Sequence, residues 1–198
     1  VIREGLLKRR EAADEYGRRD IDAILGLADR YRDEAERQGR RDIAKTLERV
    51  PRYGATSFRE ALQFFRILHF SLWLEGNYHI TVGRFDQYMF PYLQADMEKG
   101  LYTEESALSL LEDFFLSFNR DSDLYPGVQQ GDNGQSMVLG GMGPDGGDGF
   151  NLLSKLCLRA SEDLAMIDPK INLRVSRETP LEIYELGSEL TAVGLGFP

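Results

Sequence analysis

The fold is decided by residues 137–149, which read Met137-Val138-Leu139-Gly140-Gly141-Met142-Gly143-Pro144-Asp145-Gly146-Gly147-Asp148-Gly149. The apolar residues at its start are typical of a short buried strand, and the glycines and aspartates that follow predict a tight loop. Residues 150–165, directly after the loop, have the apolar spacing of a helix. Residues 171–175 then alternate with period two, which predicts a second strand.

Another helix follows that strand. Thr179-Pro180-Leu181-Glu182 is a capping-box signature with proline at N1, and the helix should end near Val193 with Gly194 after it. Two strands, each followed by a helix, indicate α/β units of a larger parallel sheet or barrel. Because two strands cannot complete such a sheet, we expect the chain to be a mostly helical part of an incomplete α/β fold.

The sequence before these strands is helical. Residues 2–38 carry apolar positions at helical spacing among charges, with a break near Gly17, and a second helix over 41–50 is stopped by Pro51 and Gly54. Ser57-Phe58-Arg59-Glu60 is another capping box. Helices are predicted over 58–75, 87–99 (capped by Asp86 and closed by Gly100) and 103–119, with an extended connector over 77–84 and a polar stretch over 120–135.

Composition narrows the function classes. The 198 residues carry a net charge of −9, which argues against non-specific nucleic-acid binding. With one cysteine and two histidines, neither a disulfide nor a structural zinc site is expected. The single cysteine makes a reducing, cytoplasmic setting the default expectation. No apolar run has membrane length, so no membrane association is expected. The start at Val1 without methionine and the turn over 194–198 suggest a fragment.

Polar groups gather in the connector around residues 76–88. A histidine, a hydroxyl, an arginine, a carboxylate and an amide lie within nine residues between two helices. Loops held by rigid elements often carry binding groups. The alternative is structural: Asp86 only caps its helix and Arg84 only pairs with it.

The glycine-rich stretch over residues 131–149 has its own alternatives. Its backbone N–H groups could cradle a phosphate, but the spacing matches neither known phosphate-binding motif. Asp145 and Asp148 could bind calcium, although the EF-hand spacing is absent. A plain tight crossover is the simplest interpretation. Cys157, in the middle of a predicted helix, reads as an inert buried thiol.

Four ordered segments resemble one family, the glycyl-radical enzymes of the pyruvate formate-lyase type. Residues 57–63 are similar to that family's "SFxEALQ" helix, and 83–92 to its "GRFDQYxYPYY" segment. Residues 135–148 resemble its glycine-rich crossover, and 168–175 its "P-N-L-x-V-R" strand. The most specific of these is Gly83-Arg84-Phe85-Asp86-Gln87-Tyr88.

The resemblance implies a ten-stranded α/β barrel, with residues 1–56 as outer helices and 57–198 as first-half strands and helices. It implies a glycyl radical near the family's C-terminus, installed without oxygen by a radical S-adenosylmethionine enzyme, and a thiyl radical on a cysteine loop that abstracts hydrogen from a small-molecule substrate. Such enzymes are usually homodimers. Neither radical motif occurs in these 198 residues, so no cofactor and no catalytic residue is expected in this chain.

What carries over is one wall of the pocket. The resemblance implies that Thr81, Asp86 and Gln87 face the substrate, with Phe85 and His79 as weaker candidates. The family usually has serine at Thr81, so the extra methyl group narrows the pocket. The segment looks closer to the dehydratase and decarboxylase branches, although a formate acetyltransferase label is compatible with it.

Two rival functions stay open. The charged helices of residues 1–50 fit a non-enzymatic helical interaction module, which would fold cooperatively and stay monodisperse in isolation. The glycine-rich loop fits a nucleotide-binding domain, which ATP or NAD should stabilise thermally.

Overall fold

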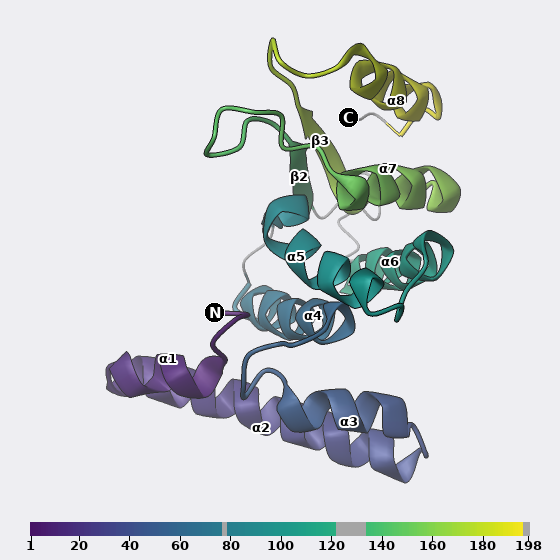
Figure 1. The fold of residues 1–198 in the computed structure, drawn as a ribbon. Helices are drawn as coiled ribbons and strands as arrows, with labels where there is room; N and C mark the ends of the chain where they lie inside the picture. The colour runs from purple at the N-terminus through teal and green to yellow at the C-terminus, as the bar shows by residue number, and fades with distance from the viewer. Residues whose placement is uncertain (77–78, 122–133, 196–198) are drawn as a thin grey trace, which may run out of the picture. The chain divides into compact units, whose positions relative to one another are not determined.

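The computed structural model describes residues 1–76, 79–121 and 134–195 (Figure 1). The chain divides into two compact units, Val1–Gly76 and Asn77–Pro198. The fourth helix belongs to the first unit. The assignment of residues 1–56 to outer helices and 57–198 to first-half strands and helices stays a prediction. Residues 131–133 of the predicted glycine-rich motif and 196–198 of the final turn lie outside the described residues.

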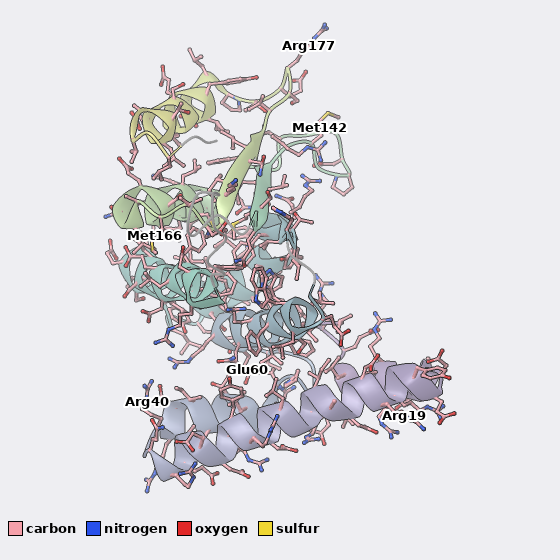
Figure 2. The ribbon with its side chains drawn as sticks, turned by 180° about the vertical axis from the view of Figure 1, so that it is seen from behind. Arg19, Arg40, Glu60, Met142, Met166 and Arg177 are labelled. Carbon is pink, nitrogen blue, oxygen red and sulfur yellow. The ribbon has the colours of Figure 1, made fainter. Side chains whose placement is uncertain are left out.

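The first unit is entirely helical in regular structure. Its helices are α1 (Leu6–Ala12), α2 (Glu15–Arg37), α3 (Arg41–Arg49) and α4 (Phe58–Leu74). Ala28 of α2, Leu47 of α3 and Ile67 of α4 form a buried cluster, against which Ile24 and Ile43 pack. Arg19 of α2 and Arg40 before α3 carry their charges outward (Figure 2).

The helix predicted over residues 2–38 is broken near Gly17, as expected. The break lies at Ala13 and Asp14, and the Asp14 carboxylate accepts a hydrogen bond of 2.8 Å from the Gly17 amide. Gly17 therefore lies inside the first turn of α2. An aspartate that satisfies a free amide is a common start of a helix.

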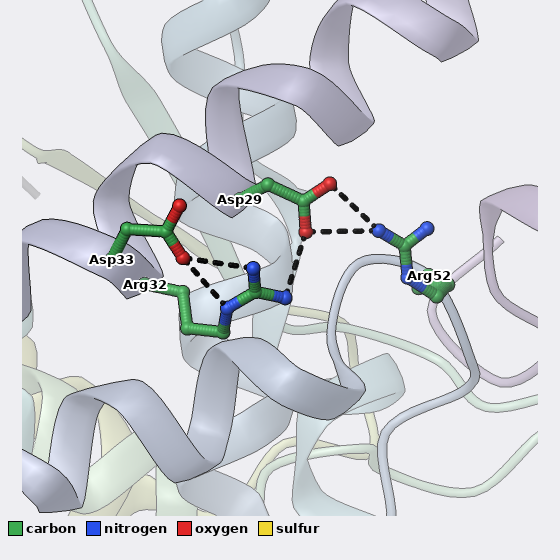
Figure 3. Close-up of polar contacts among 4 residues, drawn as sticks. All are labelled: Asp29, Arg32, Asp33 and Arg52. Atoms are coloured by element: carbon green, nitrogen blue, oxygen red, sulfur yellow. Dashed lines mark hydrogen bonds and ion pairs between the residues drawn. The ribbon is translucent and has the colours of Figure 1, made fainter. Parts of the chain in front are cut away.

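Ion pairs connect elements of the first unit. Arg52, in the loop after α3, places Nη2 2.9 Å from each carboxylate oxygen of Asp29 on α2 (Figure 3). The same carboxylate accepts a hydrogen bond from Arg32, which also bonds Asp33. Because Asp29 and Arg52 are both partly covered, this pair fixes the loop on the helix more firmly than an exposed pair would.

The predicted capping box of α4 is half formed. The Ser57 hydroxyl accepts a hydrogen bond from the Glu60 amide at 3.2 Å. The Glu60 carboxylate bonds the amide and hydroxyl of Thr56, at 2.7 and 2.8 Å, instead of reaching Ser57. The helix begins where the sequence predicts it, through a different second contact.

The second unit contains a small parallel sheet. Its elements are β1 (Gly83–Arg84), α5 (Phe85–Glu98), α6 (Glu104–Phe118), a 3₁₀ turn (Asn119–Asp121), β2 (Ser136–Gly140), α7 (Leu152–Leu164), β3 (Lys170–Arg174) and α8 (Leu181–Ala192). The strand order is β1-β2-β3, and both pairs are parallel. Met137, Leu139 and Ile171 are buried on one face, while Asn172 and Arg174 are exposed on the other.

Helices follow each strand, as the α/β interpretation requires. Beneath the sheet, Phe85 of α5 stacks on Phe114 of α6 at 5.4 Å between ring centres, and Phe118 meets Phe114 edge-on at 5.0 Å. These rings anchor the start of α5 in the core. The first turn of α5, which directly follows β1, is therefore anchored by a buried ring.

Two predicted helix starts in this unit are wrong. The helix predicted from residue 87 begins at Phe85, after an Arg84 N-cap without a side-chain cap, so Asp86 does not cap it. At α8, Pro180 is the N-cap and Leu181 the first helical residue. The predicted end of α8 is confirmed, since Val193 is the C-cap and Gly194 has a φ of 87°. None of the helices in the described ranges is long and apolar enough to cross a membrane.

Candidate functional site

Three elements meet at the carboxyl end of β2. β1 leads without a gap into α5, so Arg84, Asp86 and Gln87 lie at one corner of the unit. β2 ends at Gly140, and the glycine-rich loop returns to α7, whose N-cap is Asn151. The parallel pairing of β1 with β2 brings this corner beside the loop.

Asp86 is fully buried, and its two carboxylate oxygens differ. Oδ2 accepts hydrogen bonds from the Gly140 amide and the Ser154 hydroxyl, both at 2.6 Å. Oδ1 is also buried and has no hydrogen-bond partner among the residues that the structure describes. The structural alternative from the sequence is therefore wrong, because Asp86 neither caps α5 nor forms an ion pair with Arg84.

Burial shifts the titration of this carboxyl. Loss of water raises the pKa of Asp86 above its ordinary value, while the Gly140 amide, the Ser154 hydroxyl and the nearby side chains of Gln87 and Arg84 lower it in part. The carboxyl lies at the N-terminal end of α7, where a negative charge is favoured. Burial and these contacts therefore act on the pKa of Asp86 in opposite directions, and burial is the larger effect.

Arg84 and Gln87 bind the two ends of the same loop. Arg84 donates from Nη2 to the Gly140 carbonyl at 2.8 Å, and Gln87 donates from Nε2 to the Gly149 carbonyl at 2.7 Å. Together with Asp86 they form what we call the loop clamp: Arg84, Asp86 and Gln87. The clamp ties both ends of a ten-residue loop, residues 140–149, to one helical turn.

The loop itself is a small hairpin. Gly149 donates to the Gly141 carbonyl at 2.7 Å and Gly143 to the Gly147 carbonyl at 2.8 Å. A Cβ on Gly149 would lie only 2.7 Å from the Gly141 oxygen, so the close approach requires glycine. The backbone amides of Gly143 and Gly149 thus donate to carbonyls of the same loop. They are not available to bind a phosphate, as the nucleotide-binding interpretation requires.

The loop aspartates bind the chain's own groups. Asp145 accepts from the Gly147 amide, and Asp148 accepts from the Phe150 amide and the Thr179 hydroxyl. Thr179 was expected to cap α8, but it joins the glycine loop to the connection after β3. Met142 and Arg177, labelled in Figure 2, mark these two connections, which extend past the same end of the sheet.

The remaining predicted residues lie apart from the clamp. Thr81 is exposed, donates to the Ser136 carbonyl at 2.9 Å and accepts from the Gly83 amide at 3.2 Å. Ser136 begins β2 and Gly140 ends it, so the groups bound by Thr81 and Asp86 lie about 10 Å apart at the usual strand rise. Thr81 and Asp86 therefore bind opposite ends of β2, and their common role in one pocket wall stays a prediction.

His79 and Phe85 differ in accessibility. His79 is exposed and has a left-handed backbone, with φ of 58°. Phe85 has no exposed surface and packs between Phe114 and Tyr88, so its ring belongs to the core and not to an open pocket. Of the five predicted residues, the structure joins only Asp86 and Gln87 in one network.

The sequence did not single out Asn151 and Ser154. The side-chain oxygen of Asn151 accepts hydrogen bonds from the backbone amides of Leu153 and Ser154. The backbone amide of Asn151 donates to the Ser154 hydroxyl at 2.9 Å. The spacing of Asn151 and Ser154 is that of a capping box, which was the available signal. Their contact with Asp86, 68 residues from Ser154, has no local signature.

Cys157 lies one turn further along α7. It is fully buried, and burial raises the pKa of its thiol well above the ordinary value, with the Asp86 charge adding to the shift. A neutral, covered thiol is a poor nucleophile.

Comparisons with known proteins agree with this fold. The family model described as pyruvate formate lyase-like matches residues 4–198. The chain is 27% identical over 196 residues to trans-4-hydroxy-L-proline dehydratase of Clostridioides difficile, which covers 92% of the chain and 24% of that protein. It is 33% identical over 149 residues to (2S)-3-sulfopropanediol dehydratase of Klebsiella oxytoca, which covers 72% of the chain and 18% of that protein. The chain thus spans about a quarter or less of the length of these relatives.

A solved structure concerned with 1,2-propanediol dehydration in Roseburia inulinivorans superposes on the whole chain. Its TM-score is 0.89 at 26% identity, and the match covers 100% of this chain and 28% of that one. The expectation of a partial α/β barrel is confirmed by this superposition and by the three parallel strands. By its family model, its relatives and its fold, this chain belongs to the pyruvate formate lyase-like family of glycyl-radical enzymes.

Proposed function

We propose that the chain is part of a glycyl-radical lyase or dehydratase that acts on a small polar metabolite by thiyl-radical hydrogen abstraction. Family membership supports the chemistry, and the names of two relatives, dehydratases of a hydroxylated amino acid and of a sulfonated diol, support the substrate class. In a cell the parent is a cytoplasmic homodimer that works without oxygen.

The 198 residues alone do not catalyse. They contain neither the cysteine loop nor the terminal glycine motif of the family, and their single cysteine is buried in α7. The radical glycine and the thiyl cysteine belong to other sequence of the parent, and a radical S-adenosylmethionine enzyme installs the radical there. This part supplies one wall of the substrate pocket.

The observation that carries the proposal is the unbonded Oδ1 of Asp86. A buried acceptor without a donor costs about 1–3 kcal/mol, so a substrate hydroxyl or ammonium group that donates to it gains that energy. Thr81 binds the other end of the substrate.

The other predicted residues have supporting roles. Gln87 holds the loop through its hydrogen bond to the Gly149 carbonyl. His79 contributes a polar ring at the exposed end near Thr81. Phe85 acts from the core, by fixing the first turn of α5.

The test is made on the parent protein. Its reading frame should encode a cysteine loop and a terminal glycine motif after Pro198, and treatment with its activating enzyme and S-adenosylmethionine should give the electron paramagnetic resonance doublet of a glycyl radical. The 198-residue chain treated in the same way should give no signal.

Two substitutions then test the site. Asp86→Asn in the parent should leave the radical signal and remove most turnover, since an amide NH₂ replaces the acceptor. Asp145→Asn, which changes an exposed loop carboxylate by the same atoms, is the control. A reading frame that stops at Pro198 would refute the enzyme proposal, and equal turnover in both variants would refute the assignment of Asp86.

A further inference from the structure

The Asp86 carboxylate is held from one side only. Both of its hydrogen bonds converge on Oδ2, at 2.6 Å each, while Oδ1 receives none from the described part of the chain. When two hydrogen bonds fix one carboxylate oxygen, the direction in which the other oxygen points is also fixed. The orientation of Oδ1 therefore depends on the two donors, a backbone amide and the Ser154 hydroxyl.

The Ser154 hydroxyl both accepts and donates a hydrogen bond. It accepts a hydrogen bond of 2.9 Å from the backbone amide of Asn151. The backbone amide of Ser154 in turn donates to the side-chain oxygen of Asn151 at 3.3 Å. One of the two lone pairs of the hydroxyl oxygen is used in this way, and the hydroxyl proton is donated to Asp86 Oδ2 at 2.6 Å. Asn151 also reaches the Gly149 carbonyl at 3.3 Å, so the helix cap and the loop end are one network.

We propose that Ser154 is a positioning residue for Asp86: with the Gly140 amide it fixes Oδ2 and leaves Oδ1 as the one oxygen that accepts a hydrogen bond from a substrate donor. The proposal deepens the proposed function and rests on it for the substrate. The group bound at Oδ1 is a hydroxyl or an ammonium, because an ionised acceptor there would repel the carboxylate.

The charged and titratable groups around the carboxyl are few in the described ranges. Arg84 lies at the end of β1, Tyr88 on α5 and Cys157 on α7. Burial raises the pKa of the Tyr88 hydroxyl, and both Tyr88 and Cys157 stay neutral near pH 7. The Gly140 amide, the Ser154 hydroxyl, Gln87 and Arg84 are therefore the groups that stabilise the ionised form.

The first test uses the 198-residue chain. The pKa of Asp86 is measured by ¹³C NMR of the labelled carboxyl in the wild type and in Ser154→Ala. Removal of a hydrogen bond to the charged form should raise the pKa, and Ser154→Thr, which keeps the hydroxyl, should restore it. Ser161→Ala is the matched control, since Ser161 is a buried serine two turns along the same helix.

The second test uses the activated parent enzyme. Ser154→Ala should keep the radical signal and lower kcat/KM by up to roughly 100-fold, with the acidic limb of the pH profile moved to higher pH. Ser161→Ala should leave both unchanged. Ser154→Thr should recover most of the loss.

The outcomes separate the two proposals. An unchanged pKa of Asp86 in Ser154→Ala, or an equal change in Ser161→Ala, overturns the positioning role whatever the parent does. If Ser154→Ala raises the pKa of Asp86 in the 198-residue chain but the parent forms no glycyl radical, the proposed function is overturned. The positioning of Asp86 by the Ser154 hydrogen bond then still holds. If Ser154→Ala raises the pKa of Asp86 but leaves kcat/KM and the pH profile of the parent enzyme unchanged, the link between Ser154 and substrate binding is overturned.

Discussion

A buried carboxyl such as Asp86 makes stability depend on pH. Its pKa in the folded chain is raised above the ordinary value of 3.8, mainly by burial. The folded state then holds the proton more tightly than the unfolded state, so this group's contribution is fully present below pH 3.8 and is lost as pH rises through the folded pKa.

The prediction compares the wild type with Asp86→Asn, which stays neutral at every pH. The wild type should lose stability relative to the variant as pH rises from the ordinary carboxyl pKa of 3.8 through the raised pKa of the folded chain. Urea unfolding at several pH values measures the difference. A difference that stays constant over this range would contradict a raised pKa.

The Asp29–Arg52 pair carries a second prediction at the residue scale. Both partners are partly covered, and the guanidinium meets both carboxylate oxygens. A double-mutant cycle with Asp29→Asn and Arg52→Gln should give a coupling of about 1 kcal/mol. The exposed Arg19–Glu15 pair, with both side chains more than 70% exposed, should give about 0.3 kcal/mol. Equal couplings would show that cover contributes nothing here.

Single residues also show where sequence reasoning stops. Ser57 caps α4 as expected because its partner is three residues away. Asp86 looks like a cap for the same reason, yet its oxygen goes to Gly140, 54 residues distant. Thr179 likewise bonds Asp148 and not its own helix. A local pattern cannot show a tertiary donor, so the sequence singled out Asp86 without showing the partners of its carboxylate.

At the scale of helices, two glycines form a matched pair. A Cβ on Gly26, inside α2, or on Gly100, after α5, would meet no atom within 4 Å. Gly26 has a helical backbone, whereas Gly100 has a φ of 70°. A Cβ would fit at both positions, but only Gly26 has a backbone conformation that alanine readily adopts.

Gly26→Ala should therefore stabilise the chain by about 0.5–1 kcal/mol, and Gly100→Ala should destabilise it by about 1–2 kcal/mol. Chemical denaturation of the two variants beside the wild type tests this. Effects of the same sign would mean that backbone conformation does not decide them.

Helices and the two five-residue strands follow from the sequence because periodicity extends over a turn or more. β2 and β3 lie within one residue of the predicted runs. β1 has only Gly83 and Arg84, which is too short for any alternation to be visible. Its existence depends on pairing with Met137 and Val138, a contact that periodicity does not encode.

At the scale of the whole chain, large apolar side chains remain uncovered. Leu74 is 64% exposed in the first unit, and Leu181 is 72% exposed in the second. Relatives of about four times this length contain further sequence that could cover such residues. The 198-residue chain should therefore bind a hydrophobic dye and associate with rising concentration.

Fluorescence of the dye and light scattering measure both effects. Leu74→Gln and Leu181→Gln together should reduce them, and Lys155→Gln, a polar exchange on the surface of α7, should not. A monodisperse wild-type chain that unfolds cooperatively without dye binding would instead favour a self-sufficient helical module.

The loop clamp has a consequence for building hybrid enzymes. Arg84, Asp86 and Gln87 bind partners 54 to 68 residues ahead in the chain. If only residues 84–87 were transferred from another family member, their hydrogen-bond partners in the loop and in α7 would still come from the recipient sequence. The smallest transferable module runs from β1 through the first turn of α7, and recombination points belong outside it.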